Sequence, residues 1–250
     1  MPTPFQHLVY AQEILADPDL PLNLKAHLEE HLCAFYLGAT AADVQTLTGQ
    51  PRVDTHFYHL ADVGVVRPGE VFLATYPQLA YPRHLRPAHA AFISGYLVHL
   101  LWDELWAAQI FLPFYVEAPQ WPARDQRNLH HNAVRTLLDR QAETRLRAQP
   151  CLGECIRAVA PHGWLPFVVD DALARWRDWL VIQLEDPTRV ETGAVFAGRM
   201  GVSVAEFEEV ITQVAQGRYL APPPGLDAAL AAFELSAYTA SRRLLRQYWG

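Results

Sequence analysis

Histidine and aspartate residues are the side chains of this 250-residue sequence best suited to hold a metal ion. There are 11 histidines, and neutral imidazole together with carboxylate forms the usual ligand set of zinc-type ions. His99 and Asp103 are four residues apart, so on a helix their side chains share a face. They lie in the most apolar stretch of the chain, where an unpaired carboxylate is unfavourable. A bound metal ion would remove that penalty, although an imidazole–carboxylate hydrogen bond inside a helical core is the simpler interpretation of this pair alone.

Two further candidate ligands lie upstream of this pair. Asp43 follows a Gly-Ala-Thr sequence at an expected helix junction, and His56 directly follows an Asp-Thr pair. Taken singly, each of these short segments is explained equally well by helix capping. A role as ligands requires the folded chain to bring them to His99 and Asp103.

The order of these residues resembles that of the zinc-dependent phospholipase C family, which shares an all-helical superfamily with the S1/P1 nucleases. The matching elements are His7, a Phe-x-Leu-Gly-Ala-x-Ala-x-Asp segment ending at Asp43, Thr55-His56-Phe57, and Gly-Tyr-Leu-x-His-x-x-x-Asp ending at Asp103. The resemblance covers residues 1 to about 145.

This resemblance implies an all-α fold, a multi-helix bundle of the phospholipase C/P1 nuclease type. Residues 1–150 would form the metal-binding core, and residues 151–250 a helical C-terminal extension packed on it in a single domain. Asp43, His56, His99 and Asp103 match the ligands of one zinc ion, and Asp103 would bridge to a second ion held partly by His7. The implied activity is hydrolysis of a small phosphoester or lipid headgroup by a zinc-activated water that Asp43 helps to deprotonate.

Part of the family's ligand set has no counterpart in this chain. Gln109 stands near the position of a third-zinc histidine, and neither His130 nor His131 has Asp or Glu four residues later. We therefore expect one or two zinc ions rather than three. A metal-binding or purely structural helical protein without catalytic turnover is the alternative.

Three other residues are weaker candidates for binding substrate, namely His84, Arg86 and His131. His84 and Arg86 belong to the sequence YPRHLRPAH, just before the expected central helix. They are either exposed loop residues or part of the mouth of a cleft, where they could contact a substrate phosphate.

A rival metal motif is His27-Leu28-Glu29-Glu30-His31, which fits the His-x-x-Glu-His pattern of inverted zinc peptidases with Glu30 as base. The apolar residues of the same segment follow a helical stripe that leaves both histidines at its edge. A packing or hydrated role is the preferred interpretation, and peptidase activity is the lesser alternative.

Helical periodicity dominates the pattern of apolar residues. Helices are expected over residues 5–15, 24–35 with an end near Gly38, 88–115 with an end near Pro113, 128–149 closed by Pro150, 170–184 and 226–248. Residues 190–217 resemble a helix-turn-helix, but the glutamates on its second helix, Glu206, Glu208 and Glu209, disfavour DNA binding. Only residues 64–73 suggest a strand.

Composition excludes disordered and collagen-like chains, since 51% of the residues are apolar, 19% are charged, and 13 Gly and 19 Pro form no repeat. The net charge of −7 without a basic run disfavours binding to nucleic acid. Cys33, Cys151 and Cys155 are expected to be unpaired thiols in a reducing compartment. No apolar run reaches 18 residues and no signal-peptide pattern is present, so we expect a cytoplasmic protein with no transmembrane segment.

Overall fold

The computed structural model describes residues 1–148 and 151–250, and within these ranges the regular elements are helices, with no strand. The α-helices are α1 (Pro4–Ala16), α2 (Leu22–Glu30), α3 (Leu32–Ala41), α4 (Gln45–Thr48), α5 (Arg52–His56), α6 (Pro68–Thr75), α7 (Pro87–Trp106), α8 (Arg124–Arg147), α9 (Leu152–Arg157), α10 (Asp170–Glu185), α11 (Thr192–Met200), α12 (Val204–Ala215) and α13 (Leu226–Trp249). Short 3₁₀ turns are η1 (Ala42–Val44), η2 (Leu60–Asp62), η3 (Pro77–Leu79), η4 (Pro82–His84) and η6 (Pro187–Arg189), and η5 (Ala107–Val116) is π-helical. The predicted all-α fold class is confirmed.

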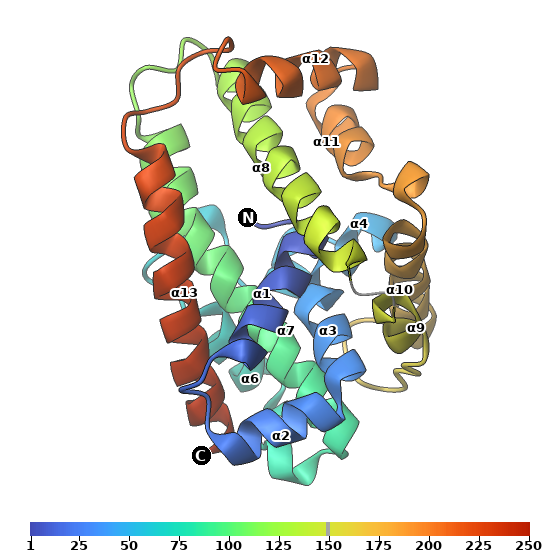
Figure 1. Ribbon diagram of the computed structural model, residues 1–250. Helices are drawn as coiled ribbons and strands as arrows, with labels where there is room; N and C mark the ends of the chain where they lie inside the picture. The colour runs from blue at the N-terminus through green and yellow to red at the C-terminus, as the bar shows by residue number, and fades with distance from the viewer. Residues whose placement is uncertain (149–150) are drawn as a thin grey trace.

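Helices α3 and α7 lie against each other at the centre of the fold (Figure 1). A Cβ atom added at Gly38 would lie 2.0 Å from the carbonyl oxygen of Phe92, and one at Gly95 would lie 2.2 Å from that of Phe35. Both positions therefore need glycine, and the two backbones approach each other directly. Because this contact holds Gly38 inside α3, the helix continues to Ala41 instead of ending near Gly38 as predicted.

The segment predicted as one helix over residues 24–35 consists of two helices that meet at His31. The backbone of His31 has φ −115° and ψ 34°, outside the helical range, so α2 ends at Glu30 and α3 begins at Leu32. The apolar stripe is continuous along the sequence, but it cannot reveal this break because Leu24 and Leu28 are buried in the same core as α3.

The predicted central helix over residues 88–115 corresponds to α7 and its continuation η5. The N–H of Glu117 donates to the carbonyl of Leu112, five residues earlier, at 2.9 Å. This wider π-helical turn includes Pro113, so the helix ends three residues after the proline that was predicted to stop it. The added turn adjoins α8, which follows it.

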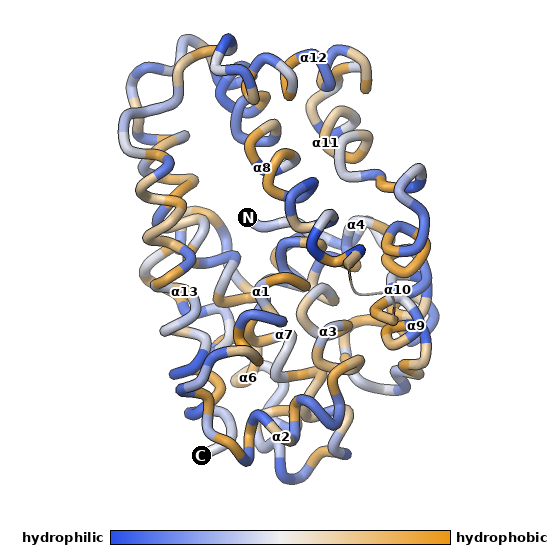
Figure 2. The backbone as a smooth tube through the Cα atoms, in the orientation of Figure 1, coloured by the Kyte–Doolittle hydropathy of each residue, from blue (hydrophilic) through white to orange (hydrophobic). Residues whose placement is uncertain are grey.

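The helices predicted over residues 128–149, 170–184 and 226–248 correspond to α8, α10 and α13. Along α8 and α13 hydrophobic and hydrophilic residues alternate, as expected for amphipathic helices (Figure 2). The predicted end of the first of these helices, at residues 149–150, lies outside the described residues. The predicted strand at 64–73 is wrong, because Pro68 begins α6, where a proline at the first helical position is favourable.

The C-terminal segment packs on the helices of the N-terminal part through buried aromatic residues. The indole N–H of Trp176 on α10 donates to the hydroxyl of Thr40 on α3 at 3.2 Å, and that of Trp102 on α7 donates to Ser241 on α13 at 2.8 Å. Phe233 on α13 contacts Trp102 edge to face, at a centroid distance of 5.4 Å. One hydrophobic core therefore includes residues from both segments.

The helix-turn-helix predicted within residues 190–217 is present as α11, a turn at Gly201 and α12. Ser203 and Glu206 cap α12 reciprocally, and Glu208 forms an ion pair with Arg140 of α8 at 2.6 Å. Apolar residues from α11 and α12 pack against α8 in a second, smaller core. The second helix is therefore held against this protein's own α8.

The cysteine prediction is wrong for two of the three residues. Cys33 in the first turn of α3 and Cys155 on α9 form a disulfide; their Cα atoms are 5.2 Å apart, and the residues are 122 positions apart in sequence. The sequence could not reveal this pairing, because three cysteines allow several connections and only the fold brings two together. Cys151 is free and exposed.

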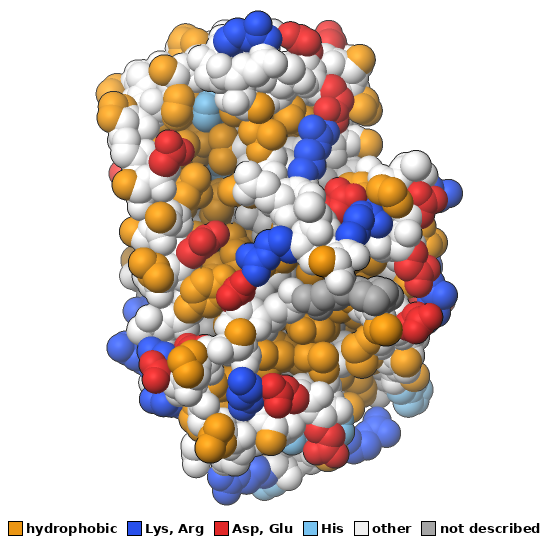
Figure 3. Space-filling view, viewed as in Figure 1, with side chains coloured by type: hydrophobic (Ala, Val, Ile, Leu, Met, Phe, Trp, Pro, Cys, Tyr) orange, Lys and Arg blue, Asp and Glu red, His pale blue; other side chains and the backbone are white. Residues whose placement is uncertain are grey.

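Charged side chains of both signs are interspersed on the face of the molecule seen in Figure 3. Among the described residues, no helix is both long and apolar enough to cross a membrane.

Candidate metal centre

The five predicted metal ligands come together in the folded chain, from four separate elements. His7 lies on α1, Asp43 in η1, His56 at the end of α5, and His99 and Asp103 on α7. Four of the five are at most 2% exposed, whereas the side chain of Asp43 is 20% exposed. The cluster is thus buried, with Asp43 as its member closest to solvent.

In this cluster the Nε2 atom of His56 lies close to donor atoms of Asp43, His99 and Asp103, at distances like those between ligands of one ion. The Nε2 atom of His56 lies 3.4 Å from Nε2 of His99 and 3.2 Å from Oδ2 of Asp103. Asp43 Oδ1 is 3.7 Å from the same His56 atom, and Asp103 Oδ2 is 3.8 Å from Nε2 of His99. Ligands bound at about 2.0–2.1 Å from a tetrahedral zinc ion are about 3.3–3.4 Å from one another. The residues therefore fit a zinc-sized ion.

Hydrogen bonds orient both central imidazoles with a free Nε2 lone pair. His99 Nδ1 lies 2.8 Å from the carbonyl oxygen of Ala39, and since a carbonyl only accepts, Nδ1 carries the proton. His56 Nδ1 lies 2.9 Å from the hydroxyl of Thr55, which can accept the Nδ1 proton while donating its own to the carbonyl of Arg52 at 3.3 Å; in this tautomer Nε2 is free. Such partners on the second ring nitrogen are typical of metal-binding histidines.

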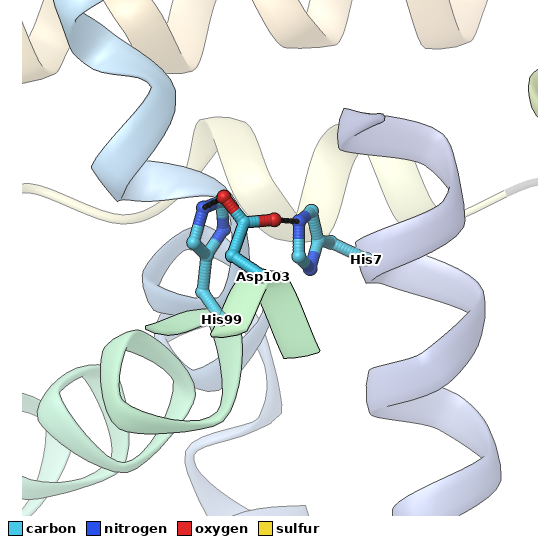
Figure 4. Close-up of side chains that lie close together, drawn as sticks. All are labelled: His7, His99 and Asp103. Atoms are coloured by element: carbon cyan, nitrogen blue, oxygen red, sulfur yellow. Dashed lines mark ion pairs between the residues drawn. The ribbon is translucent and has the colours of Figure 1, made fainter. Parts of the chain in front are cut away.

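The carboxylate of Asp103 lies between His7 and His99 (Figure 4). Its Oδ1 atom is 3.4 Å from Nε2 of His7, whereas Oδ2 faces His56 and His99. The His7 ring also stacks on that of His99, with centroids 3.8 Å apart. Both Asp103 Oδ1 and His7 Nε2 are buried without a hydrogen-bond partner, which is unfavourable. A second ion between these two atoms would give each of them a partner.

Arg52 is a member of the site that the sequence analysis missed. Its Nη2 atom lies 2.5 Å from Oδ2 of Asp103 and donates to the hydroxyl of Tyr58 at 3.2 Å. The available signal was its position four residues before His56, which places both on one side of a short helix. The Arg52 guanidinium is therefore a cationic partner for the buried Asp103 carboxylate that needs no bound ion.

The pKa values favour the protonation states that metal ligands require. Burial, followed by the nearby His99, lowers the pKa of His7 to about 4, and burial followed by the Arg52 charge lowers the pKa of His56 to about 4. Burial by itself would raise the pKa of Asp103, but its contacts with His56 and His7 hold it well below its ordinary range. At neutral pH both imidazoles are therefore neutral and the carboxylate is ionised.

The three predicted substrate-binding residues do not join this cluster. His84 and Arg86 are exposed at the N-terminal end of α7, and Asp103 lies 17 residues beyond Arg86, about 25 Å along the helix. His131 is buried on α8, where its Nε2 atom accepts a hydrogen bond from the indole N–H of Trp106 at 3.1 Å. The sequence near the central helix could not show whether the cluster forms at the N-terminal or the C-terminal end of that helix.

The rival His27/Glu30/His31 motif is not arranged as a metal site. Since α2 ends at Glu30, His31 lies outside the helix and the two imidazoles meet edge to face at 5.0 Å. His27 packs on Trp249 at a centroid distance of 4.4 Å, and Glu30 is exposed. In the described part of the chain, the groups able to hold an ion are His7/His99/Asp103 and Asp43/His56/His99.

Comparison of the chain with models of protein families, with curated proteins and with solved structures finds no match.

Proposed function

We propose that this protein is a metal-dependent phosphoester hydrolase of the phospholipase C type, with zinc held by Asp43, His56, His99 and Asp103. The proposal rests on one observation above all, the ligand-like distances between Nε2 of His56 and donor atoms of Asp43, His99 and Asp103. Two imidazoles and two carboxylates are a donor set typical of zinc. The unpartnered atoms of His7 and Asp103 support a second ion, with Asp103 as the bridge.

The chemistry divides between the ion and the chain. When bound, zinc polarises a phosphoryl oxygen and lowers the pKa of a water molecule. Asp43 is the partly exposed ligand, and its carboxylate is the group that accepts a proton from the attacking water. The water oxygen forms a bond to phosphorus, the bond from phosphorus to the leaving oxygen breaks, and the leaving alcohol takes up a proton from solvent. The other ligands are buried, so they hold the geometry without meeting bulk water.

The test is metal content together with hydrolysis of bis(4-nitrophenyl) phosphate. The purified protein is stripped with a chelator, reloaded with zinc and assayed in both states. We expect the reloaded protein to hold one or two ions and to hydrolyse the diester, and the His99→Ala variant to lose both properties while keeping its helical circular dichroism. His162→Ala, which removes an exposed histidine, is the matched control and should behave as the wild type. Activity that persists in fully stripped protein or in His99→Ala would refute the proposal.

One observation favours a second candidate, a structural helical protein without turnover. The contact between Arg52 and Asp103 already supplies a positive charge to the buried carboxylate. In that case the cluster would stabilise the fold as a network of hydrogen bonds and ion pairs. A protein that binds zinc but is inert would support a metal-binding module, and a protein that binds no zinc would support the structural role.

A further inference from the structure

A pocket opens next to the candidate metal centre, on the side where Asp43 is partly exposed. It is small, with a cavity volume of about 40 Å³. Its walls include Asp43, Thr46, Arg135 on α8, Trp179 on α10, and Phe196 and Arg199 on α11. Asp43 belongs to both the cluster and the pocket, so a molecule in this pocket would lie next to the candidate metal centre.

Arg135 contributes a guanidinium whose partners are all uncharged. Its Nε atom donates to the carbonyl of Met1 at 2.5 Å, its Nη1 atom donates to the Asn132 side chain at 2.8 Å, and the group lies over the ring of Phe196, 4.3 Å from the centroid. Among the described residues, no carboxylate oxygen comes within 4.0 Å of it. A half-buried guanidinium held in this way lacks the anionic partner that usually accompanies it.

Arg199 reaches the same pocket from α11. Its Nη2 atom donates to the hydroxyl of Thr46 at 3.0 Å, and no carboxylate of the described chain pairs with it either. Burial lowers the pKa of Arg135 to about 10, the carboxylates of Asp103 and Asp43 oppose this decrease, and the charge of Arg199 adds to it. The positive charges of Arg135 and Arg199 thus line one small pocket. An anion bound between them would reduce their mutual repulsion.

We infer that Arg135 and Arg199 form an oxyanion site, which binds a phosphoryl group carrying two negative charges next to Asp43. Two guanidiniums from different helices offer donors in two directions, which suits the several oxygens of a tetrahedral oxyanion. The small volume of the pocket limits its occupant to a small anionic group. This inference rests on the proposed function only for its substrate: it makes a phosphomonoester dianion the preferred substrate over a diester with a single charge.

The repulsion from Asp43 also predicts a dependence on metal. A carboxylate that lines the pocket opposes an anion unless a cation compensates its charge. Phosphate should therefore bind more tightly to the zinc-loaded protein than to the stripped protein. In both forms, binding should depend on Arg135 and Arg199.

The experiment is a calorimetric titration with inorganic phosphate, on the full-length protein with stoichiometric zinc and after stripping. Arg199→Gln should weaken phosphate binding about tenfold or more, because it removes a charge-assisted contact at an exposed residue that the fold does not need. Arg189→Gln, which changes an exposed arginine outside the pocket, should leave the affinity unchanged. Arg135→Lys keeps the charge but loses the forked donor and should also weaken binding. In kinetics, Arg199→Gln should reduce kcat/KM for 4-nitrophenyl phosphate more than for bis(4-nitrophenyl) phosphate.

The outcomes separate this inference from the proposed hydrolase function. Equal phosphate affinity in the wild type and Arg199→Gln, or no phosphate binding by the wild type, would overturn the oxyanion site even if the protein hydrolyses phosphoesters. Arginine-dependent phosphate binding by a protein that hydrolyses nothing would support the site and refute the hydrolase.

Discussion

The carbonyl oxygen of Ala39 lies 2.8 Å from Nδ1 of His99, and this contact joins the packing of the core to the candidate metal centre. Ala39 follows Gly38, where the backbone of α3 touches that of α7. His99 lies one turn beyond Gly95, the second glycine of the same contact. The distance between the two helices therefore sets the orientation of the imidazole.

Gly95→Ala should weaken both the fold and metal binding. A Cβ atom at this position would lie 2.2 Å from the Phe35 carbonyl oxygen and 2.7 Å from the Ala39 nitrogen, so α3 and α7 must move apart. We expect a loss of about 1–3 kcal/mol in the free energy of unfolding in urea, with weaker zinc binding. Gly198→Ala in α11 is the control, since no atom lies within 4 Å of its added Cβ, and it should raise stability by about 0.5–1 kcal/mol. Equal effects of the two substitutions would contradict the role of the glycine contact.

His7→Gln should remove one of two zinc ions. Asp103 Oδ1 and His7 Nε2 face each other without other partners, so we expect a second ion to depend on His7 and the first to be held by the other four candidate ligands. Native mass spectrometry should show two ions in the wild type and one in the variant. A single ion in both proteins would contradict the bridging role of Asp103.

The stability of the metal-free protein should fall as the pH is lowered from about 6.5 to about 4. The pKa values of His7 and His56 are lowered to about 4 in the fold, so between these limits the unfolded chain binds more protons than the folded one. Each imidazole can contribute up to about 3 kcal/mol to this loss. Burial also lowers the pKa of His130 to about 4 and that of His131 well below its ordinary value, which adds to the loss. Burial raises the pKa of Asp139 to about 6, which acts in the opposite direction; the histidines outweigh it, so we expect a net loss of several kcal/mol. Urea unfolding of the stripped protein at several pH values measures this loss of stability. A free energy of unfolding that stays constant across this range would contradict the burial of neutral imidazoles.

The disulfide between Cys33 and Cys155 should make a large contribution to stability. It closes a loop of 122 residues, for which the chain-entropy model gives a maximum of about 4–5 kcal/mol. Cys33→Ser should lower the guanidinium unfolding midpoint, whereas Cys151→Ser, which changes the free and exposed cysteine, should not. Similar midpoints for the two variants would show that the bridge does not constrain the unfolded chain.

The sequence predicted those parts of the fold that follow from local periodicity. The stripes of apolar residues indicated α1, α7, α10 and α13, and the turn at Gly201 between α11 and α12 was also foreseen. The break at His31 and the passage of α3 through Gly38 were not, because both depend on how α2 and α3 pack on α7. The disulfide was missed for the same reason: contact between residues 122 positions apart leaves no trace in one sequence.

For the site, residue types and order predicted the candidate ligands, and the fold showed which other residues contact them. A resemblance in sequence pattern named His7, Asp43, His56, His99 and Asp103, all of which lie in the cluster. It could not show that Arg52 reaches Asp103, since that contact spans 51 residues between two helices. Nor could it show that His84 and Arg86 lie far from the cluster, at the other end of α7. Their distance from the cluster is known only once the fold shows where along α7 the cluster lies.

Anomalous diffraction at the zinc edge, from crystals of the zinc-loaded protein grown without chelator, tests the proposed metal centre itself. We predict a peak within about 2.0–2.2 Å of Nε2 of His56, Nε2 of His99 and the carboxylates of Asp43 and Asp103, with a weaker or equal peak between Asp103 and His7. A map without a peak among these side chains, while Arg52 remains in contact with Asp103, would contradict it.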